Sequence, residues 1–300
     1  MNTAAEATGQ PGTLRFWLDQ AQSQHADQPL AITAALTARA ASLPADADGA
    51  EAIRLAEHVW LAHAADTAGL QAFLGALPAA LSDDASTAPS LQRAGLALAW
   101  LAGQTAPTQP DATRWRVLQN VVLAMAAQGR SAEALGLLQA DEATARALGP
   151  SDAGKAFAAT ANNVASHLQD GPRGDAARDW LMLQAAAIAR RAWASAGGWM
   201  QVERADYRLA LCHAAAGQGA EAVEHARRCL AGCVAAGDLA DALEHFFAYE
   251  ALVRAHRAAG DAAAAGAAVQ RMQVLLADIA EADGLRAWCA DVLSALPAPG

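Results

Sequence analysis

Apolar residues recur at helical spacing from about residue 13 onward, and short breaks rich in Gly, Pro and Asp interrupt this pattern. Examples of these breaks are "LPADADG", "GQTAPTQPD", "LGPSD" and "DGPRGD". Breaks of a few residues are typical of the connections between packed helices, and about fourteen helices fit between them. The chain is rich in Ala and poor in β-branched residues, which favours helices over strands. The pattern therefore predicts an all-α fold.

Four stretches of the second half share the same spacing of small residues. In each, a Gly is followed five positions later by an Ala, and successive glycines are about 42 to 46 residues apart. The pairs are Gly129 and Ala134, Gly171 and Ala176, Gly217 and Ala222, and Gly260 and Ala265. A Gly can end a first helix in the left-handed conformation, and the later Ala lets the second helix approach closely. The spacing thus predicts a repeated helix pair.

This pattern, with its "GQGAEA"-like turns, resembles the tetratricopeptide repeat (TPR) family over roughly residues 111–280. The resemblance implies a helical-hairpin solenoid wound as a right-handed α-α superhelix. The copies differ from the family in three ways. Their period exceeds the usual length of about 34 residues, most lack the closing Pro, and the Trp of the first helix is replaced. Longer helices and an altered superhelical twist are therefore expected.

We expect four regions along the chain. They are a disordered N-terminus at 1–12, degenerate helical pairs at 13–110 that pack on the solenoid, TPR-like repeats at 111–282, and a capping helix and tail at 283–300. An independent helical bundle at 13–110 is the alternative. The Pro-containing break at 105–111 is the one candidate boundary between the two halves.

The charge distribution argues against a nucleic-acid partner. The net charge is −10, and residues 1–110 hold four basic against ten acidic side chains. Nucleic-acid binding requires a basic patch or stripe, and the sequence has no such run. The first residues lack the pattern of a secretory signal, and no apolar stretch is long enough to span a membrane. We expect a cytoplasmic protein with reduced thiols.

Two short motifs match nucleotide-binding patterns as text only. "GPSDAGKA", Gly149 to Ala156, is close to a phosphate-binding loop but lacks the hydroxyl residue after Lys155 and a preceding strand. We interpret Ser151 instead as a helix N-cap. "GQGAEA", Gly217 to Ala222, matches a dinucleotide fingerprint but also follows a helical pattern. No nucleotide or other cofactor is expected.

Histidine and cysteine residues offer one candidate metal set. His225, Cys229 and Cys233 share one face of a predicted helix, and Cys212 lies on the helix expected to pack against it. Thiolates with imidazole can bind Zn²⁺ or Cu⁺. Buried Cys more often packs as a small apolar residue, so we interpret these residues as core and predict no metal site. The other histidines are scattered singly.

Polar residues on the first helices of the pairs form the candidate binding surface. The resemblance implies that first helices line a concave face, where peptide-binding members use Asn and basic residues. The candidate residues are Arg116, Gln119, Asn120, Asn162, Asn163, Arg204, Tyr207, Arg208, Glu250 and Arg254. The sequence therefore predicts a non-enzymatic scaffold or adaptor that binds a protein or peptide. The alternative is a sensor or regulatory domain for a small molecule or signalling peptide.

Overall fold

The computed structural model describes residues 10, 12–104, 111–281 and 284–296. These residues form fourteen α-helices, which confirms the predicted all-α class and the predicted number of helices. The chain divides into two compact units, Met1–Leu137 (unit 1) and Leu138–Gly300 (unit 2), and the boundary falls within helix α7. Most of the N-terminal segment 1–12, the break at 105–110 and the tail at 297–300 lie outside the described residues.

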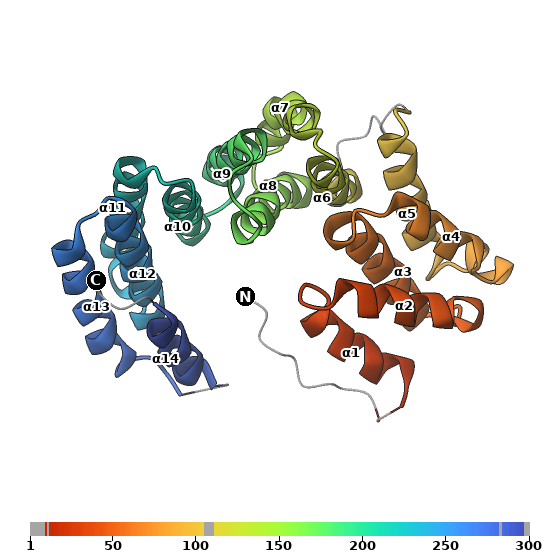
Figure 1. Ribbon diagram of the computed structural model, residues 1–300, viewed down its shortest axis with the longest axis horizontal. Coiled ribbons are helices and arrows are strands. Elements are labelled where there is room, and N and C mark those ends of the chain that lie inside the picture. The colour runs from red at the N-terminus through yellow and green to blue at the C-terminus, as the bar shows by residue number, and fades with distance from the viewer. Residues whose placement is uncertain (1–9, 11, 105–110, 282–283, 297–300) are drawn as a thin grey trace. The chain divides into compact units, whose positions relative to one another are not determined.

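The described part of unit 1 contains mostly short α-helices, two 3₁₀-helices (η1 and η3) and one π-helix (η2). Its elements are α1 (Leu14–Gln24), α2 (Pro29–Arg39), η1 (Ala40–Ser42), α3 (Ala47–His58), η2 (Val59–His63), α4 (Thr67–Gly75), η3 (Ala79–Ser82), α5 (Ala88–Leu101), α6 (Ala112–Ala127) and the first part of α7 (Ser131–Ala147). The segment η2 is a π-helix that directly continues α3. Figure 1 draws these elements in red to yellow-green.

The π-helix η2 occupies the centre of unit 1. It contacts α2, α3, α4 and α6, and its residues Val59, Trp60 and Leu61 are buried. The Trp60 ring lies 5.1 Å from that of Phe73 on α4. Gly69 allows this approach, because a Cβ atom there would lie 2.4 Å from the Trp60 indole nitrogen. The core of unit 1 is therefore assembled around the segment that follows α3.

Unit 2 contains longer helices that pack in sequence order. After the end of α7 come α8 (Asp152–Asp170), α9 (Ala176–Ala196), α10 (Trp199–Ala215), α11 (Gly219–Ala236), η4 (Gly237–Leu239), α12 (Ala242–Ala258), α13 (Ala262–Leu276) and α14 (Leu285–Ala295). The most extensive contacts join α8 to α9, α10 to α11 and α12 to α13. The first helices of these pairs also touch, α8 against α10 and α10 against α12. Unit 2 is thus an array of helical hairpins (Figure 1).

Three of the four predicted turn glycines adopt the left-handed conformation. Gly129, Gly217 and Gly260 have φ values of 76°, 73° and 76°. Each stands two positions before the first residue of the next helix. The alanines five positions after these glycines, Ala134, Ala222 and Ala265, are buried.

The fourth copy was predicted in the wrong register. Gly171 is extended, with φ −83°, and Ala176 is exposed. The left-handed residue is Gly174, with φ 101°, and it again stands two positions before a helix, α9. Pro172 and Arg173 extend this loop, so the helix begins later than the repeat spacing implied.

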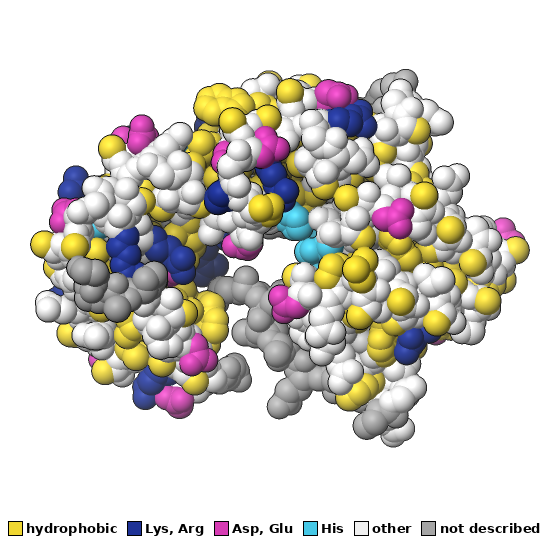
Figure 2. Space-filling model, viewed as in Figure 1, with side chains coloured by type: hydrophobic (Ala, Val, Ile, Leu, Met, Phe, Trp, Pro, Cys, Tyr) yellow, Lys and Arg dark blue, Asp and Glu magenta, His cyan; other side chains and the backbone are white. Residues whose placement is uncertain are grey.

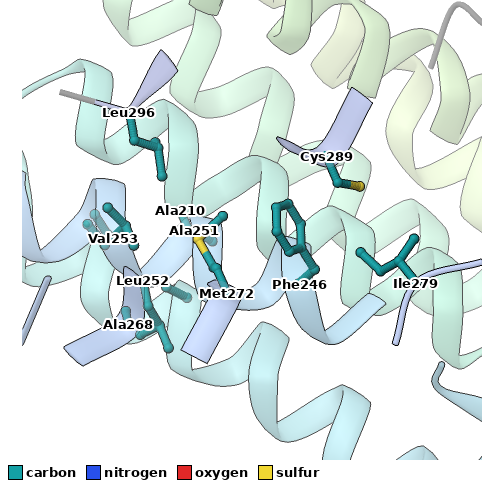
Figure 3. Close-up of a cluster of buried hydrophobic side chains, with 13 residues drawn as sticks. Ala210, Phe246, Ala251, Leu252, Val253, Ala268, Met272, Ile279, Cys289 and Leu296 are labelled. Atoms are coloured by element: carbon teal, nitrogen blue, oxygen red, sulfur yellow. The ribbon is translucent and has the colours of Figure 1, made fainter. Parts of the chain in front are cut away.

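The C-terminal hairpins of unit 2 enclose a continuous apolar core. Phe246, Met272 and Cys289 are fully buried and come from α12, α13 and α14 (Figure 3). Ala210 of α10 packs against the same cluster. The small Ala side chains let these helices approach closely, while the few large side chains fill the space between them.

Candidate functional site

The predicted residues of α10 and α12 come together at the contact between these two first helices. Arg204 forms an ion pair with Glu244, and the Tyr207 hydroxyl donates to Glu250 at 2.6 Å. Glu250 also accepts a hydrogen bond from Arg254 Nε at 2.6 Å. Both carboxylates are buried, whereas the two arginine side chains are nearly half exposed, at 48% and 46%. Buried acids therefore hold two guanidinium groups at the surface.

Burial fixes the protonation of Tyr207. Its burial, with the nearby Glu250 carboxylate, raises the pKa of the Tyr207 hydroxyl well above its ordinary value. The hydroxyl therefore keeps its proton and donates to Glu250. Tyr207, which is half-buried, and Glu250, which is 2% exposed, join α10 to α12, so Glu250 is not at the solvent-facing surface that the sequence analysis expected.

The predicted residues of α8 lie on the neighbouring first helix. Arg208 of α10 donates to Gln169 of α8 at 2.6 Å. Asn163 is exposed and Asn162 is half-buried. We call the polar residues Asn162, Asn163, Arg204, Arg208 and Arg254 of these contacting helices the first-helix row. Figure 2 shows basic side chains gathered on the face of unit 2 where Figure 1 draws α12.

The three predicted residues of α6 belong to unit 1. Arg116 is exposed and Gln119 is half-buried, but Asn120 is 1% exposed. The Asn120 side chain is engaged within unit 1, since Nδ2 donates to Glu57 Oε1 at 2.7 Å and Oδ1 lies 2.9 Å from His58 Nδ1. Asn120 therefore serves an internal contact instead of the expected groove surface.

The cysteines do not gather with His225. All four are buried free thiols. Cys229 Sγ donates to Glu203 at 2.7 Å, while the His225 ring turns to Asp206 at 3.3 Å. Burial and the Glu203 carboxylate raise the pKa of Cys233 to about 12, and they raise that of Cys229 further. Both groups are therefore protonated thiols at neutral pH.

Burial also shifts the pKa of Glu203, the carboxyl group that accepts from the Cys229 thiol. It raises the pKa of the Glu203 carboxyl to about 7, and the nearby Glu244 adds to this effect. Glu203 lies at a groove of about 520 Å³ between α10 and α11, which Trp199 and Leu239 also line. A carboxyl group that titrates near neutral pH is thus placed beside a surface groove.

Neither text match to a nucleotide motif forms such a site. Ser151 caps α8, as predicted, because its hydroxyl accepts from Gly154 N at 3.1 Å. Gly149 precedes it with φ 54°, and helices stand on both sides of the turn. Gly217 likewise connects α10 to α11. The described residues include no strand that could carry a phosphate-binding or dinucleotide-binding turn.

Three histidines that the sequence analysis treated as isolated lie together in unit 1. His25 follows α1, His58 ends α3 and His63 ends η2. Their ring centroids are 5.0 to 5.2 Å apart. Residues five apart lie on different sides of an α-helix, so only the π-helical turn brings His58 and His63 together. The sequence carries no evident signal for that turn.

Comparison of the chain with models of protein families, with curated proteins and with solved structures finds no match. None of the helices in the described part of the chain is long and apolar enough to cross a membrane.

Proposed function

We propose that unit 2 is a TPR-like right-handed solenoid of helical hairpins that binds an acidic segment of a protein partner along the first-helix row. It acts as a non-enzymatic adaptor. The observation that carries the proposal is the pair Arg204 and Arg254, each held by a buried glutamate and each nearly half exposed. Guanidinium groups that are already oriented lose little conformational freedom when they bind a carboxylate.

The contacts between first helices support this proposal. Because α8, α10 and α12 touch in succession, their polar residues follow one another across the array. Asn amides can pair with a peptide backbone, and Arg can bind a carboxylate through two parallel hydrogen bonds. Helical-hairpin arrays gain affinity from many modest contacts on a preformed surface and need no reactive group.

Three aromatic side chains, from α10, α12 and α14, contact one another in succession. The ring of Tyr207 lies 6.1 Å from that of Phe247, which lies 5.0 Å from that of Trp288. The Trp288 side chain of α14 is 40% exposed. An acidic segment that also carries an apolar residue would match the exposed Trp288 ring, since exposed aromatic rings are common anchors in interfaces.

The test uses peptides of known sequence. A random peptide library displayed on phage is selected on the full-length protein, and one enriched peptide is measured by fluorescence polarisation. We expect enrichment of Asp and Glu, and we expect Arg204→Gln, Arg254→Gln and Asn162→Ala each to weaken binding by about 1–3 kcal/mol. Arg227→Gln is the matched control, because Arg227 is exposed on the second helix α11.

Loss of the Arg204 charge leaves Glu244 buried without its cation, so folding is tested separately. The double variant Arg204→Gln with Glu244→Gln removes both charges of the pair, and its helicity and Tm should remain near those of the wild type. Binding that survives in this folded double variant and in Arg254→Gln would contradict the proposal. Selection of peptides without acidic residues would contradict it as well.

A further inference from the structure

We propose that His25, His58 and His63 form a three-histidine site for a zinc ion. One nitrogen from each ring lies within 4.8 Å of the other two, and all three side chains are half-buried. This inference concerns unit 1 alone and does not depend on the proposed peptide surface of unit 2.

The spacing of the nitrogens matches the size of the ion. His58 Nε2 and His63 Nε2 are 3.2 Å apart. Zinc binds histidine nitrogen at about 2.0–2.1 Å in tetrahedral sites, which separates two ligand nitrogens by about 3.3–3.4 Å. The ligand nitrogen of His25 lies within 4.8 Å of the other two ligand nitrogens.

The backbone explains why two ligands come from one segment. The amide of Ala64 donates to the Val59 carbonyl at 2.9 Å, which is the i→i+5 bond of a π-turn. This wider turn brings residues five apart to the same side. Single π-turns are frequently found at functional sites, and here the turn serves to place His63 beside His58.

Contacts to Nδ1 of His25 and His58 select the tautomer that a metal requires in two of the three rings. His58 Nδ1 donates to the Asn120 side-chain oxygen at 2.9 Å, and His25 Nδ1 donates to the Gln22 carbonyl at 2.7 Å. With the proton on Nδ1, the lone pair is on Nε2. Histidines that bind metals almost always donate their other N–H to a carbonyl or carboxylate in this way.

Asn120, which accepts the hydrogen bond from His58, belongs to a buried polar network in the core of unit 1. Asn120 donates to Glu57 Oε1, and Glu57 Oε2 lies 2.8 Å from Arg93 Nε as an ion pair. Glu57 is fully buried and Asn120 is 1% exposed. Because Glu57 holds the Asn120 side chain in place, the hydrogen bond from His58 Nδ1 to Asn120 fixes the orientation of the His58 ring. Asn120 is therefore a positioning residue for the site.

The ligand chemistry and the accessibility of the cluster favour zinc. Neutral imidazole is a preferred ligand of Zn²⁺. Without a metal, His63 Nε2–H donates to the His58 Nε2 lone pair at 3.2 Å, and a zinc ion would displace that proton. Since the three side chains are only half-buried, an ion can enter, and a water molecule can supply the fourth ligand of a three-histidine site.

The experiment uses full-length protein without a histidine tag. After treatment with a chelator, the protein is titrated with Zn²⁺ by calorimetry and with Co²⁺, whose visible absorption reports tetrahedral coordination. We expect one ion per chain and a tetrahedral Co²⁺ spectrum that Zn²⁺ abolishes. His25→Gln, His58→Gln and His63→Gln should each weaken Zn²⁺ binding by at least about 10-fold, and Asn120→Ala by about 10- to 100-fold.

Two controls separate a real site from surface binding and from misfolding. His245→Gln removes a half-buried histidine of unit 2 and should leave the affinity unchanged. His63→Cys keeps a zinc ligand at the same position and should restore tight binding, with a thiolate-to-cobalt absorption band that His245→Cys lacks.

Three results would overturn the proposal. They are the absence of stoichiometric binding by the wild type, equal affinity in the His63→Gln and His245→Gln variants, and loss of binding in a Cys229→Ser, Cys233→Ser variant while the histidine variants still bind.

Discussion

Gly219 at the start of α11 lies against the backbone of Ala259 at the end of α12, and a Cβ atom on Gly219 would be 2.5 Å from the Ala259 Cα. A side chain there cannot be accommodated by rotating a flexible group, because the neighbouring atoms are backbone. We expect Gly219→Ala to lower the free energy of unfolding by about 1–3 kcal/mol. Gly266→Ala in α13 is the control, since a Cβ atom there meets no atom within 4 Å. Chemical denaturation should show that control to be at least as stable as the wild type.

Ala222, in the first turns of α11, tests the register of the helix pair. It is fully buried, whereas Ala220 in the same helix is exposed. Ala222→Leu should overpack the contact and cost about 1–3 kcal/mol of stability, and Ala220→Leu should change it little. The comparison is made by urea denaturation of both variants. Equal losses at the two positions would contradict this placement of α11.

Ser151 and Lys155 distinguish a helix cap from a phosphate-binding loop. Because the Ser151 hydroxyl accepts from Gly154 N, Ser151→Ala should cost about 1 kcal/mol. Lys155 is exposed, so Lys155→Ala should leave the Tm unchanged. ATP with Mg²⁺ should also leave it unchanged, whereas a ligand at 100 times its Kd would add about 2.7 kcal/mol of stability. An increase in Tm with ATP that Lys155→Ala abolishes would restore the nucleotide-binding interpretation.

Local sequence predicted the features that depend on neighbouring residues. The periodicity gave the all-α class, and the left-handed turns at Gly129, Gly217 and Gly260 follow from the conformational freedom of Gly. The register failed at Gly171, because the longer loop there moves the left-handed residue to Gly174. A fixed repeat spacing cannot account for an insertion within one loop.

The candidate sites depend on contacts between distant residues and were harder to predict. Asn120 was expected at a surface, but it contacts Glu57 and His58, more than sixty positions earlier. The histidine cluster was not foreseen, because His58 and His63 would lie on different sides of a regular α-helix. Arg204 and Arg254 of unit 2 were both among the candidates, as was Glu250, the partner of Arg254, but Glu244, the buried partner of Arg204, was not.

Glu203 gives unit 2 a stability that depends on pH near neutrality. Burial raises its pKa to about 7 in the folded protein, above its ordinary value of 4.5. The folded state therefore binds a proton that the unfolded state has already released in the interval between these values. The corresponding stabilisation is complete below about pH 4.5 and is lost as the pH rises through about 7.

The variant Glu203→Gln isolates this effect, because the amide keeps the oxygen that accepts from Cys229 and does not ionise. At pH 5 the variant and the wild type should have similar stability, since Glu203 is then protonated. At pH 8 the variant should be more stable by about 1–3 kcal/mol, because it avoids a buried carboxylate charge. Urea denaturation at several pH values checks this difference.

Glu221→Gln, at an exposed position of α11, is the control and should show a difference from the wild type that does not change with pH. A Glu203→Gln variant that is less stable than the wild type at pH 8 would show that the ionised carboxylate stabilises the fold.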